Sequence, residues 1–336
     1  MTVELVKLDV GDPKVAAFLA GHPTYLFQEP VWLEALRTLG HEVGYWCLTD
    51  GDRLVLVQPA VELGLVFFRL LYFGLPYGFA VGDLQRYGEF IRLASDAARK
   101  EGFHRIRISR SHYDPPLSLP GVREQVHVQH ILHLGGRSEE EVWRDFKRRV
   151  RHDIRVADRR GVKVVDAEAP ALRDAIFDMY LKTMKRNEAL PLWTRAMLDQ
   201  IWETIVRPGN GELLVGLHEG EPLSGLATFY SGRRCFYFLG TSSRVKRSFR
   251  PNDALFWEAM RRAMARGCED CDFMISPHDD QPLIDFKAKW GTEVYPFTFW
   301  EADLKRLPCR AWDLAYTLAR TKWGGRLARW LKGSRD

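Results

Sequence analysis

The sequence predicts an α/β protein of two tandem units, each with a mixed sheet flanked by helices. The chain has 336 residues, which is long for one domain, so two domains with separate cores are expected. Short apolar runs of strand length alternate with longer stretches whose apolar residues recur every three or four positions, as in amphipathic helices. The order of these elements occurs twice along the chain, which indicates an internal duplication.

The first unit is predicted over residues 1–135. Its three consecutive strands are followed by a loop, residues 74–78, that is too rich in Gly and Pro for regular structure. Asp83 is the expected N-cap of an amphipathic helix that Gly102 ends. The predicted strands of this unit span residues 3–8, 43–48, 54–61, 67–73, 105–109 and 126–134.

The second unit is predicted over residues 136–303. Ser138 and Glu141 have the spacing of a capping box, and they start a long helix that is expected to run through Ala157. The other predicted elements are helices at 171–187, 194–206, 251–267 and around 285–287, and strands at 162–165, 212–217, 223–230, 235–239, 271–275 and 294–300.

The two units correspond element by element. Each has three strands, an irregular loop, a helix ending at Gly, a strand ending in Ile-Ser and a final strand; Arg107-Ile108-Ser109 stands where Met274-Ile275-Ser276 stands. Three strands followed by helix, strand, helix and strand is the order of an N-acetyltransferase (GNAT)-like fold. The predicted fold class is therefore α/β (α+β): two tandem GNAT (acyl-CoA N-acyltransferase)-like domains, with mixed sheets flanked by helices.

Basic residues are concentrated in two segments, although the net charge is only +5. Residues 304–336 form a basic amphipathic tail with nine Lys and Arg against two Asp, and residues 144–163 form a second basic block. Such surfaces favour polyanionic partners: tRNA, a phosphorylated substrate or anionic lipid. The tail also carries Trp and Leu among its cations. It is either a contact with a membrane surface or lipid-linked substrate, or a helix docked on the domain with a solvated basic face.

Several classes of protein are disfavoured by the sequence. No apolar run approaches membrane-spanning length, and the start lacks the pattern of a signal peptide, so a cytoplasmic location is expected, with a membrane-peripheral one as the alternative. Five scattered cysteines do not resemble a disulfide framework or a zinc site. His278-Asp279-Asp280 lacks a further ligand, so no metal is predicted.

Several short segments resemble the FemAB-type aminoacyl transferases, tandem acetyltransferase-like folds that add amino acids from aminoacyl-tRNA to peptidoglycan precursors. The resemblance covers residues 20–300 and depends on the order and spacing of the segments together. They are Phe27-Gln28…Trp32, Arg151-His152-Asp153-Ile154-Arg155-Val156-Ala157…Gly161-Val162, Thr183-Met184-Lys185-Arg186, Phe236-Tyr237-Phe238…Arg250-Pro251…Leu255, Cys271-Asp272-Phe273 and Phe286-Lys287…Trp290-Gly291.

The resemblance implies roles for individual residues. Lys287 matches the lysine that lines the transfer channel in this family and steadies developing charge. Arg186 and Tyr237 match positions that hold the phosphorylated sugar-peptide substrate. Arg37 stands near a family lysine of similar role, so arginine there is a departure, and Leu190 replaces an aromatic residue that the family has after the Thr-x-x-Arg segment.

The residue chemistry alone leaves two interpretations of each position. Lys287, after Phe286 on a short helix, either stabilises the oxyanion that forms when an amine attacks an acyl ester or is a surface lysine. Tyr237 is either a ligand contact or a buried structural tyrosine. Arg186 ends a helix, where arginine also complements the helix dipole. Asp272 either orients a polar group beside the predicted cleft or ends a strand.

The loop before the helix at 251 bears on the choice of donor. In coenzyme A-dependent acetyltransferases this loop is glycine-rich, and its backbone amides face the pyrophosphate. Residues 247–252 contain no glycine here, and Pro251 removes an amide donor, which argues against tight coenzyme A binding. The predicted catalytic residues are Lys287 and Tyr237, and the predicted substrate-binding residues are Arg37, Arg186, Arg244, Arg250, Asn252, Asp272 and Phe286.

The leading prediction is a transferase that moves an aminoacyl group from aminoacyl-tRNA to an amine of a peptidoglycan-precursor-like acceptor, phosphorylated or lipid-linked. No tightly bound cofactor is expected, because the donor, aminoacyl-tRNA or else acyl-coenzyme A, is a substrate. Two alternatives stay open. One is a GNAT-type N-acyltransferase that uses acyl-coenzyme A, and the other is a non-catalytic module that binds an anionic partner.

Overall fold

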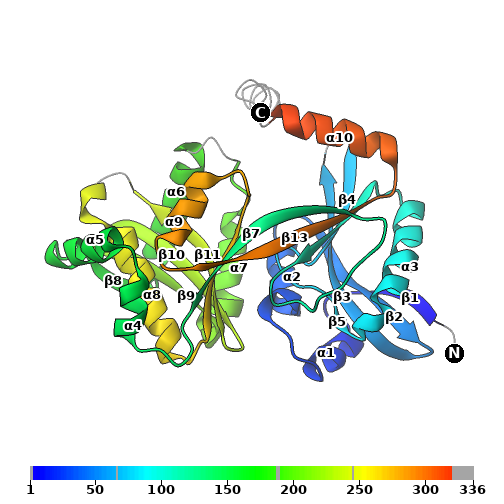
Figure 1. Ribbon diagram of the computed structural model, residues 1–336, viewed down its shortest axis with the longest axis horizontal. Coiled ribbons are helices and arrows are strands. Elements are labelled where there is room, and N and C mark those ends of the chain that lie inside the picture. Colours follow the sequence, from blue (N-terminus) through cyan, green and yellow to red (C-terminus); the bar gives the residue numbers. More distant parts are fainter. Residues whose placement is uncertain (1–2, 66, 187–189, 244–245, 320–336) are drawn as a thin grey trace.

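A computed structural model of the protein describes residues 3–65, 67–186, 190–243 and 246–319. Thirteen strands form one continuous sheet, in the order β1-β2-β3-β4-β6-β13-β7-β12-β11-β10-β9-β8, with β5 paired to β3 (Figure 1). The predicted class, a tandem GNAT-like α/β fold with mixed sheets flanked by helices, is confirmed.

The elements up to the end of the first unit are, in chain order, β1 (Val3–Leu8), α1 (Pro13–Ala20), α2 (Pro30–Arg37), β2 (Glu42–Asp50), β3 (Arg53–Leu65), β4 (Phe68–Phe73), β5 (Val81–Gly82), α3 (Tyr87–Lys100), β6 (Arg105–Arg110) and β7 (Arg123–His133).

The remaining elements are α4 (Glu139–Asp145), α5 (Arg148–Arg159), β8 (Lys163–Asp166), α6 (Pro170–Arg186), α7 (Arg195–Ile201), β9 (Gly211–His218), β10 (Glu221–Ser231), β11 (Arg234–Ser242), α8 (Pro251–Ala265), β12 (Asp270–Ser276), α9 (Gln281–Ala288), β13 (Glu293–Asp303) and α10 (Arg306–Ala319).

The two units exchange their final strands. β7, which comes before the predicted boundary at residue 135, pairs antiparallel with β12 and β13. β13, at the end of the second unit, pairs with β7 and also with β6 of the first unit. The sheet therefore continues from one unit into the other, and the division at residue 135 stays a prediction.

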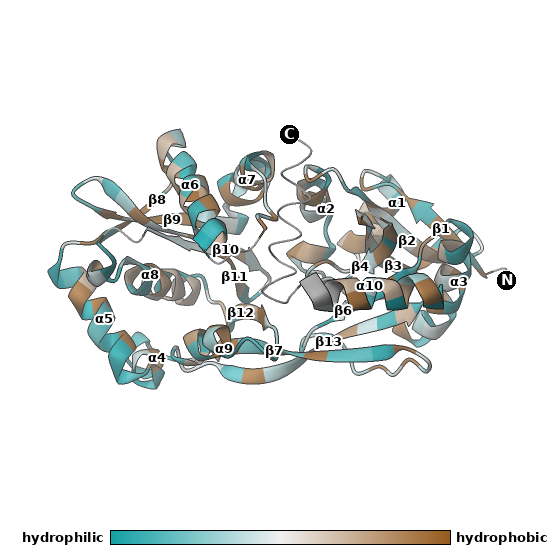
Figure 2. Cartoon of the chain, turned by 90° about the horizontal axis from the view of Figure 1, so that it is seen from above, coloured by the Kyte–Doolittle hydropathy of each residue, from teal (hydrophilic) through white to brown (hydrophobic). Residues whose placement is uncertain are grey.

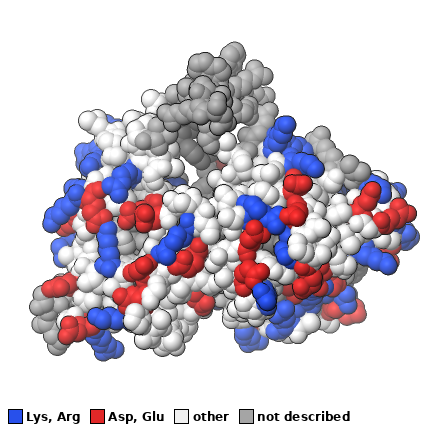
Figure 3. Space-filling view, turned by 180° about the vertical axis from the view of Figure 1, so that it is seen from behind, with Lys and Arg blue, Asp and Glu red and all other residues white. Residues whose placement is uncertain are grey.

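Helices cover both faces of the sheet in each half. Seen from above, α5 and α8 lie on one side of strands β8–β12 and α6 and α7 on the other, while α1 and α2 lie opposite α3 in the first half (Figure 2). The predicted apolar faces of α3 and α8 are buried, including Phe90 and Ala94 in the first and Leu255 and Met260 in the second. From behind, Lys and Arg are intermixed with Asp and Glu on the surface (Figure 3).

The long helix predicted from the capping box is wrong in its length. Ser138 and Glu141 do form the box, but the helix breaks between α4 and α5, where Phe146 is extended at φ −63° and ψ 139°. The amide of Lys147 there donates to the carbonyl oxygen of Lys289 at 2.9 Å. The chain leaves the helix so that this backbone can meet the end of α9, a tertiary contact that local apolar spacing does not encode.

No described helix is both long enough and apolar enough to span a bilayer.

Candidate functional site

The candidate site lies where the parallel strands β11 and β12 separate. Their pairing covers only Arg234↔Asp270, Cys235↔Cys271 and Phe236↔Asp272, although β11 continues to Ser242. Met274 has φ +60°, a left-handed conformation that is uncommon for a residue with a side chain, and it turns β12 out of register with β7. Helices α8 and α9 lie beside these strands, as Figure 2 shows.

Lys287 of α9 is buried at the turn in β12. Only 3% of its surface is exposed, and its Nζ donates to the carbonyl oxygens of Met274 at 3.0 Å and Ile275 at 2.8 Å. Burial lowers the pKa of Lys287 to about 7, against the attraction of Asp272, which raises it. The lysine therefore changes its charge near neutral pH.

Asp272 is the buried carboxylate whose negative charge raises the pKa of Lys287 most. Its oxygens accept hydrogen bonds from the Met274 amide at 2.6 Å and from Nε2 of Gln129 on β7 at 2.7 Å, with the Tyr77 hydroxyl at 3.5 Å. Burial raises the pKa of Asp272 to about 6, although these hydrogen bonds and the charge of Lys287 lower it. Gln129 and Tyr77 precede residue 135, so both units build this position.

Two adjoining cavities open beside Phe286, the neighbour of Lys287. The smaller, about 280 Å³, is lined by the rings of Tyr237, Phe256 and Phe286. Tyr237 contacts Phe256 at 4.8 Å between ring centroids, and burial raises the pKa of its hydroxyl. A methyl group on Gly240 would lie 2.3 Å from the Tyr237 hydroxyl, so only glycine leaves the ring in place.

The larger cavity, about 1060 Å³, is mainly basic and lies at the N-terminus of α8. Arg250 contacts Asp153 at 3.3 Å, and Lys289 donates to Asp253 at 2.8 Å. Arg186 instead donates to uncharged oxygens, Ser242 O at 3.5 Å and Thr183 Oγ1 at 3.3 Å. The basic residues that line this cavity are Arg149, Arg186, Arg247, Arg250 and Lys289, and the acidic ones are Asp153, Asp253 and Asp280. The arginines and lysine of this set suit an anionic group.

The cavities bring together five of the nine predicted site residues, namely Arg186, Tyr237, Arg250, Asn252 and Phe286. Lys287 and Asp272 are buried beside them and line neither cavity. Arg244 falls outside the described residues.

Arg37 lies apart from these residues, at the end of α2. Its guanidinium pairs with Asp9 at 2.6 Å and Glu34 at 2.8 Å, and it borders a separate cavity of about 460 Å³ in the first unit.

Several residues of the site have no signal in the sequence. Gln129 and Tyr77 reach Asp272 only because β7 is exchanged and the loop after β4 folds toward the second unit. His130, on β7, is fully buried; burial lowers its pKa to about 4, helped by repulsion from Lys287, so its ring is neutral. Within the described part of the chain, no group of three or more His, Cys, Asp or Glu side chains could hold a metal ion.

The basic block at residues 144–163 is engaged within the protein only in part. Arg151 donates to the carbonyl oxygens of Arg144 and Phe146, and Arg160 donates to Ser248. Arg155 lies over the ring of Trp143, 5.5 Å from its centroid. These contacts give the three arginines a structural role, while most other basic residues of the block are exposed.

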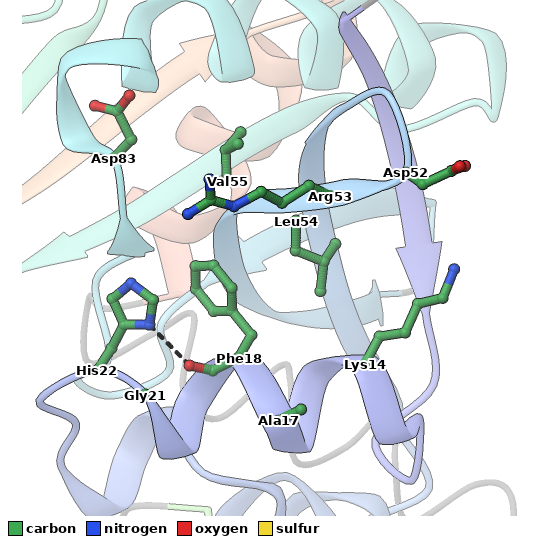
Figure 4. A pocket seen from close by; sticks show the side chains of 10 residues that line it. All are labelled: Lys14, Ala17, Phe18, Gly21, His22, Asp52, Arg53, Leu54, Val55 and Asp83. Atoms are coloured by element: carbon green, nitrogen blue, oxygen red, sulfur yellow. Dashed lines mark hydrogen bonds between the residues drawn. The ribbon is translucent and has the colours of Figure 1, made fainter.

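The corresponding loop of the first unit differs from the opening beside Lys287. The loop after β4 is closed by its own side chains, since Tyr77 and Phe79 are each 1% exposed. A cavity of about 590 Å³ lies instead between α1 and the turn before β3, where Lys14, Arg53 and Asp83 do not converge on a common point (Figure 4). The hydrogen bond drawn there joins His22 Nδ1 and the Phe18 carbonyl oxygen, which satisfies the end of a helix.

The part of the chain that contains Lys287 is similar to a known domain family. A family model described as "Acetyltransferase (GNAT) domain" matches residues 144–288. Residues 144–288 are therefore similar to a GNAT domain. Two curated relatives, both named "Lipid II:glycine glycyltransferase" and from Staphylococcus epidermidis strains, are 34% identical over 80 residues. The match covers 22% of this chain and 19% of each relative, about a fifth of their length.

Solved structures extend the likeness over most of the chain. A crystal structure of FemX superposes with a TM-score of 0.62 at 17% identity, over 88% of this chain and 96% of that one. A tandem GNAT protein from the clavulanic acid biosynthesis pathway gives 0.58 at 14% identity, over 90% and 99%. L-PGS from Bacillus licheniformis gives 0.58 at 16%, over 90% and 95%. At these identities the structures show the fold, and with the partial sequence match they confirm the predicted resemblance to FemAB-type transferases.

Proposed function

We propose that the protein is an aminoacyltransferase that moves an aminoacyl group from aminoacyl-tRNA to an amine of a cell-envelope precursor. The observation that carries the proposal is the buried Lys287 at the opening between β11 and β12, beside an aromatic cavity and a basic one. The glycyltransferase relatives and the FemX fold support the same class of reaction.

The chemistry requires one C–N bond to form and one C–O ester bond to break. The acceptor amine attacks the ester carbonyl, an oxyanion develops, and the ribose hydroxyl of the donor leaves with the proton that the amine loses. Lys287 as an ammonium has three N–H donors, of which two engage the Met274 and Ile275 carbonyls. We assign the third to the oxyanion, and Asp272 favours the charged lysine that this needs.

The basic cavity is the place that we assign to the phosphates of the donor. Arg186 is suited to this because its guanidinium donates only weakly to uncharged oxygens at 3.3 and 3.5 Å, which a phosphate would displace. The aromatic cavity next to it has space for a small acyl group. An acceptor that is phosphorylated or lipid-linked fits the name of the curated relatives, and aminoacyl-tRNA as donor places the reaction in the cytoplasm.

The second candidate is an N-acyltransferase that uses acyl-coenzyme A. The GNAT domain match favours it, because this fold generally serves acyl-coenzyme A chemistry. Against it, Pro251 opens α8, and the carboxylate of Asp253, paired with Lys289, already occupies the first turn of that helix. The negative charge of Asp253 disfavours a pyrophosphate at the backbone amides of this helix end.

The test compares binding and transfer with three probes: charged tRNA, uncharged tRNA and acetyl-coenzyme A, each with the wild type and with Lys287→Met. We expect retention of charged tRNA and transfer to an envelope-precursor amine that the Met variant loses. Lys100→Met, at an exposed lysine of α3, is the matched control. Coenzyme A binding without tRNA binding would replace the proposal by the second candidate. Binding of tRNA without transfer, by the wild type and by Lys287→Met alike, would favour a non-catalytic module.

A further inference from the structure

One face of α10 is fixed firmly to the first unit. The side chain of Cys309 is fully buried and donates to the His104 carbonyl oxygen at 3.1 Å. The ring of Trp312 stacks on Phe68, with centroids 5.0 Å apart and planes at 13°. Asp313 forms a bidentate pair with Arg105, at 2.8 and 2.9 Å. These contacts set the rotation of the helix about its axis.

The opposite face of α10 presents apolar side chains to solvent. Leu307 is 79% exposed and Leu314 is 63% exposed, and Ala311 lies between them on the same stripe. Positions four and three residues apart share one side of a helix, so the three form a continuous apolar line. Single exposed leucines are ordinary, but an ordered line of them on a rigid helix is not.

Positive charge borders this apolar line on one side. At about 100° per residue, Arg310 projects roughly 50° from the leucines and Arg306 roughly 90° from them on the same side, and both are exposed. The acidic residue of the helix, Asp313, is held in ion pairs with Arg105 and Arg123 on the packed side. By sequence, residues 304–336 carry nine Lys and Arg against two Asp. An apolar stripe bordered by arginine is the arrangement of helices that lie in the interface of an anionic bilayer.

We propose that the exposed face of α10, defined by Leu307, Ala311 and Leu314 with Arg306 and Arg310 beside them, docks on the surface of an anionic lipid bilayer. In Figure 1, α10 lies along the upper edge of the molecule, and one end of α6 also reaches that side. A bilayer on this side would face that end of α6. The proposal deepens the proposed function, since a lipid-linked acceptor rests on that function, but docking itself can be measured without catalysis.

The test is sedimentation of the full chain with phosphatidylcholine vesicles, with and without phosphatidylglycerol. We expect binding that needs the anionic lipid and weakens as salt rises. The double variant Leu307→Glu/Leu314→Glu should bind at least about tenfold more weakly than the wild type. Each substitution removes an apolar side chain from the bilayer contact and adds a negative charge that the anionic lipid repels. Val294→Glu, at a valine that is 58% exposed on β13, is the matched control and should bind as the wild type does. Circular dichroism and the thermal midpoint confirm that each variant is folded.

Four results would overturn the docking proposal. The first is equal vesicle binding by the double variant and the wild type, and the second is absence of anionic-lipid binding by the wild type. The third is vesicle binding that is lost when residues 320–336 are removed but kept by the double variant. The fourth is a concentration-dependent dimer that the double variant abolishes. The last two would assign the face to another segment or to a second copy of the chain. Lys287→Met should keep vesicle binding, and the double variant should keep transfer to a water-soluble acceptor, so failure of docking and failure of the proposed function give different results.

Discussion

Replacement of Lys287 by Met should change how the stability of the protein depends on pH. In the folded protein the pKa of Lys287 is lowered to about 7 from its ordinary 10.5. Between these values the unfolded chain binds one more proton than the folded protein does, so the free energy of unfolding rises with pH. One proton is worth about 1.4 kcal/mol per pH unit, so the wild type should gain about 2 kcal/mol between pH 7 and pH 9.

The Met variant lacks this gain. It removes the charged group whose burial is unfavourable below pH 7, but it also leaves the Met274 and Ile275 carbonyls without their donor. The two effects oppose each other at any single pH, whereas the slope with pH reports only groups that titrate, chiefly the lysine. Loss of the ammonium also raises the pKa of Asp272 above its present value of about 6, which makes the variant less stable as pH rises and enlarges the difference.

The measurement is urea unfolding of the wild type and Lys287→Met at half-unit steps from pH 7 to pH 9. We expect the difference in free energy of unfolding, wild type minus variant, to increase by about 2 kcal/mol or more over this range. Lys100→Met should run parallel to the wild type, because that lysine is exposed. Parallel curves for the wild type and Lys287→Met would refute a buried lysine that deprotonates near pH 7.

Three further outcomes follow from the same geometry. Loss of the Lys287 charge should lower kcat as pH rises above about 7, and a rate that keeps rising to pH 9 would contradict an ammonium at the oxyanion. Arg186→Ala should lower kcat/KM about tenfold or more, because it lines both cavities, whereas Arg37→Ala should change it less than about threefold; equal effects in steady-state kinetics would refute the assignment. Gly240→Ala should destabilise the protein by about 1–3 kcal/mol in denaturant titrations, through the clash with the Tyr237 hydroxyl. In a Tyr237→Phe background the destabilisation should be smaller, and a destabilisation of the same size would place the clash elsewhere.

Local patterns in the sequence predicted most of the elements, apart from the helix that breaks between α4 and α5. The apolar spacing of α8 and the strand ending in Met274-Ile275-Ser276 are confirmed, as is the equivalent strand β6. Periodicity reports which face of an element is buried, and it does so with a few residues of sequence. It does not report which strand pairs with which, so the exchange of β7 and β13 was not predicted.

The chemistry of the site depends on tertiary contacts, which the periodicity of the sequence does not encode. Lys287 was open to interpretation as a surface lysine, since lysine is rarely buried, and it is buried because the left-handed turn at Met274 aims two carbonyl oxygens at it. Arg37 was predicted at the site from the resemblance, yet it lies at the end of α2 in ion pairs with Asp9 and Glu34. An alignment by short segments fixes the order of residues along the chain, but it does not fix which of them share a cavity.

Strand exchange lets the first unit contribute side chains to the site of the second unit. Its own opening after β4 is closed by Tyr77 and Phe79, but the Tyr77 hydroxyl extends to Asp272 of the second unit. The exchanged strand β7 adds Gln129, which holds the same carboxylate. If Asp272 keeps Lys287 charged, then the electrostatics of the lysine depend on side chains from the first unit, and the duplication serves to complete one site rather than to build two.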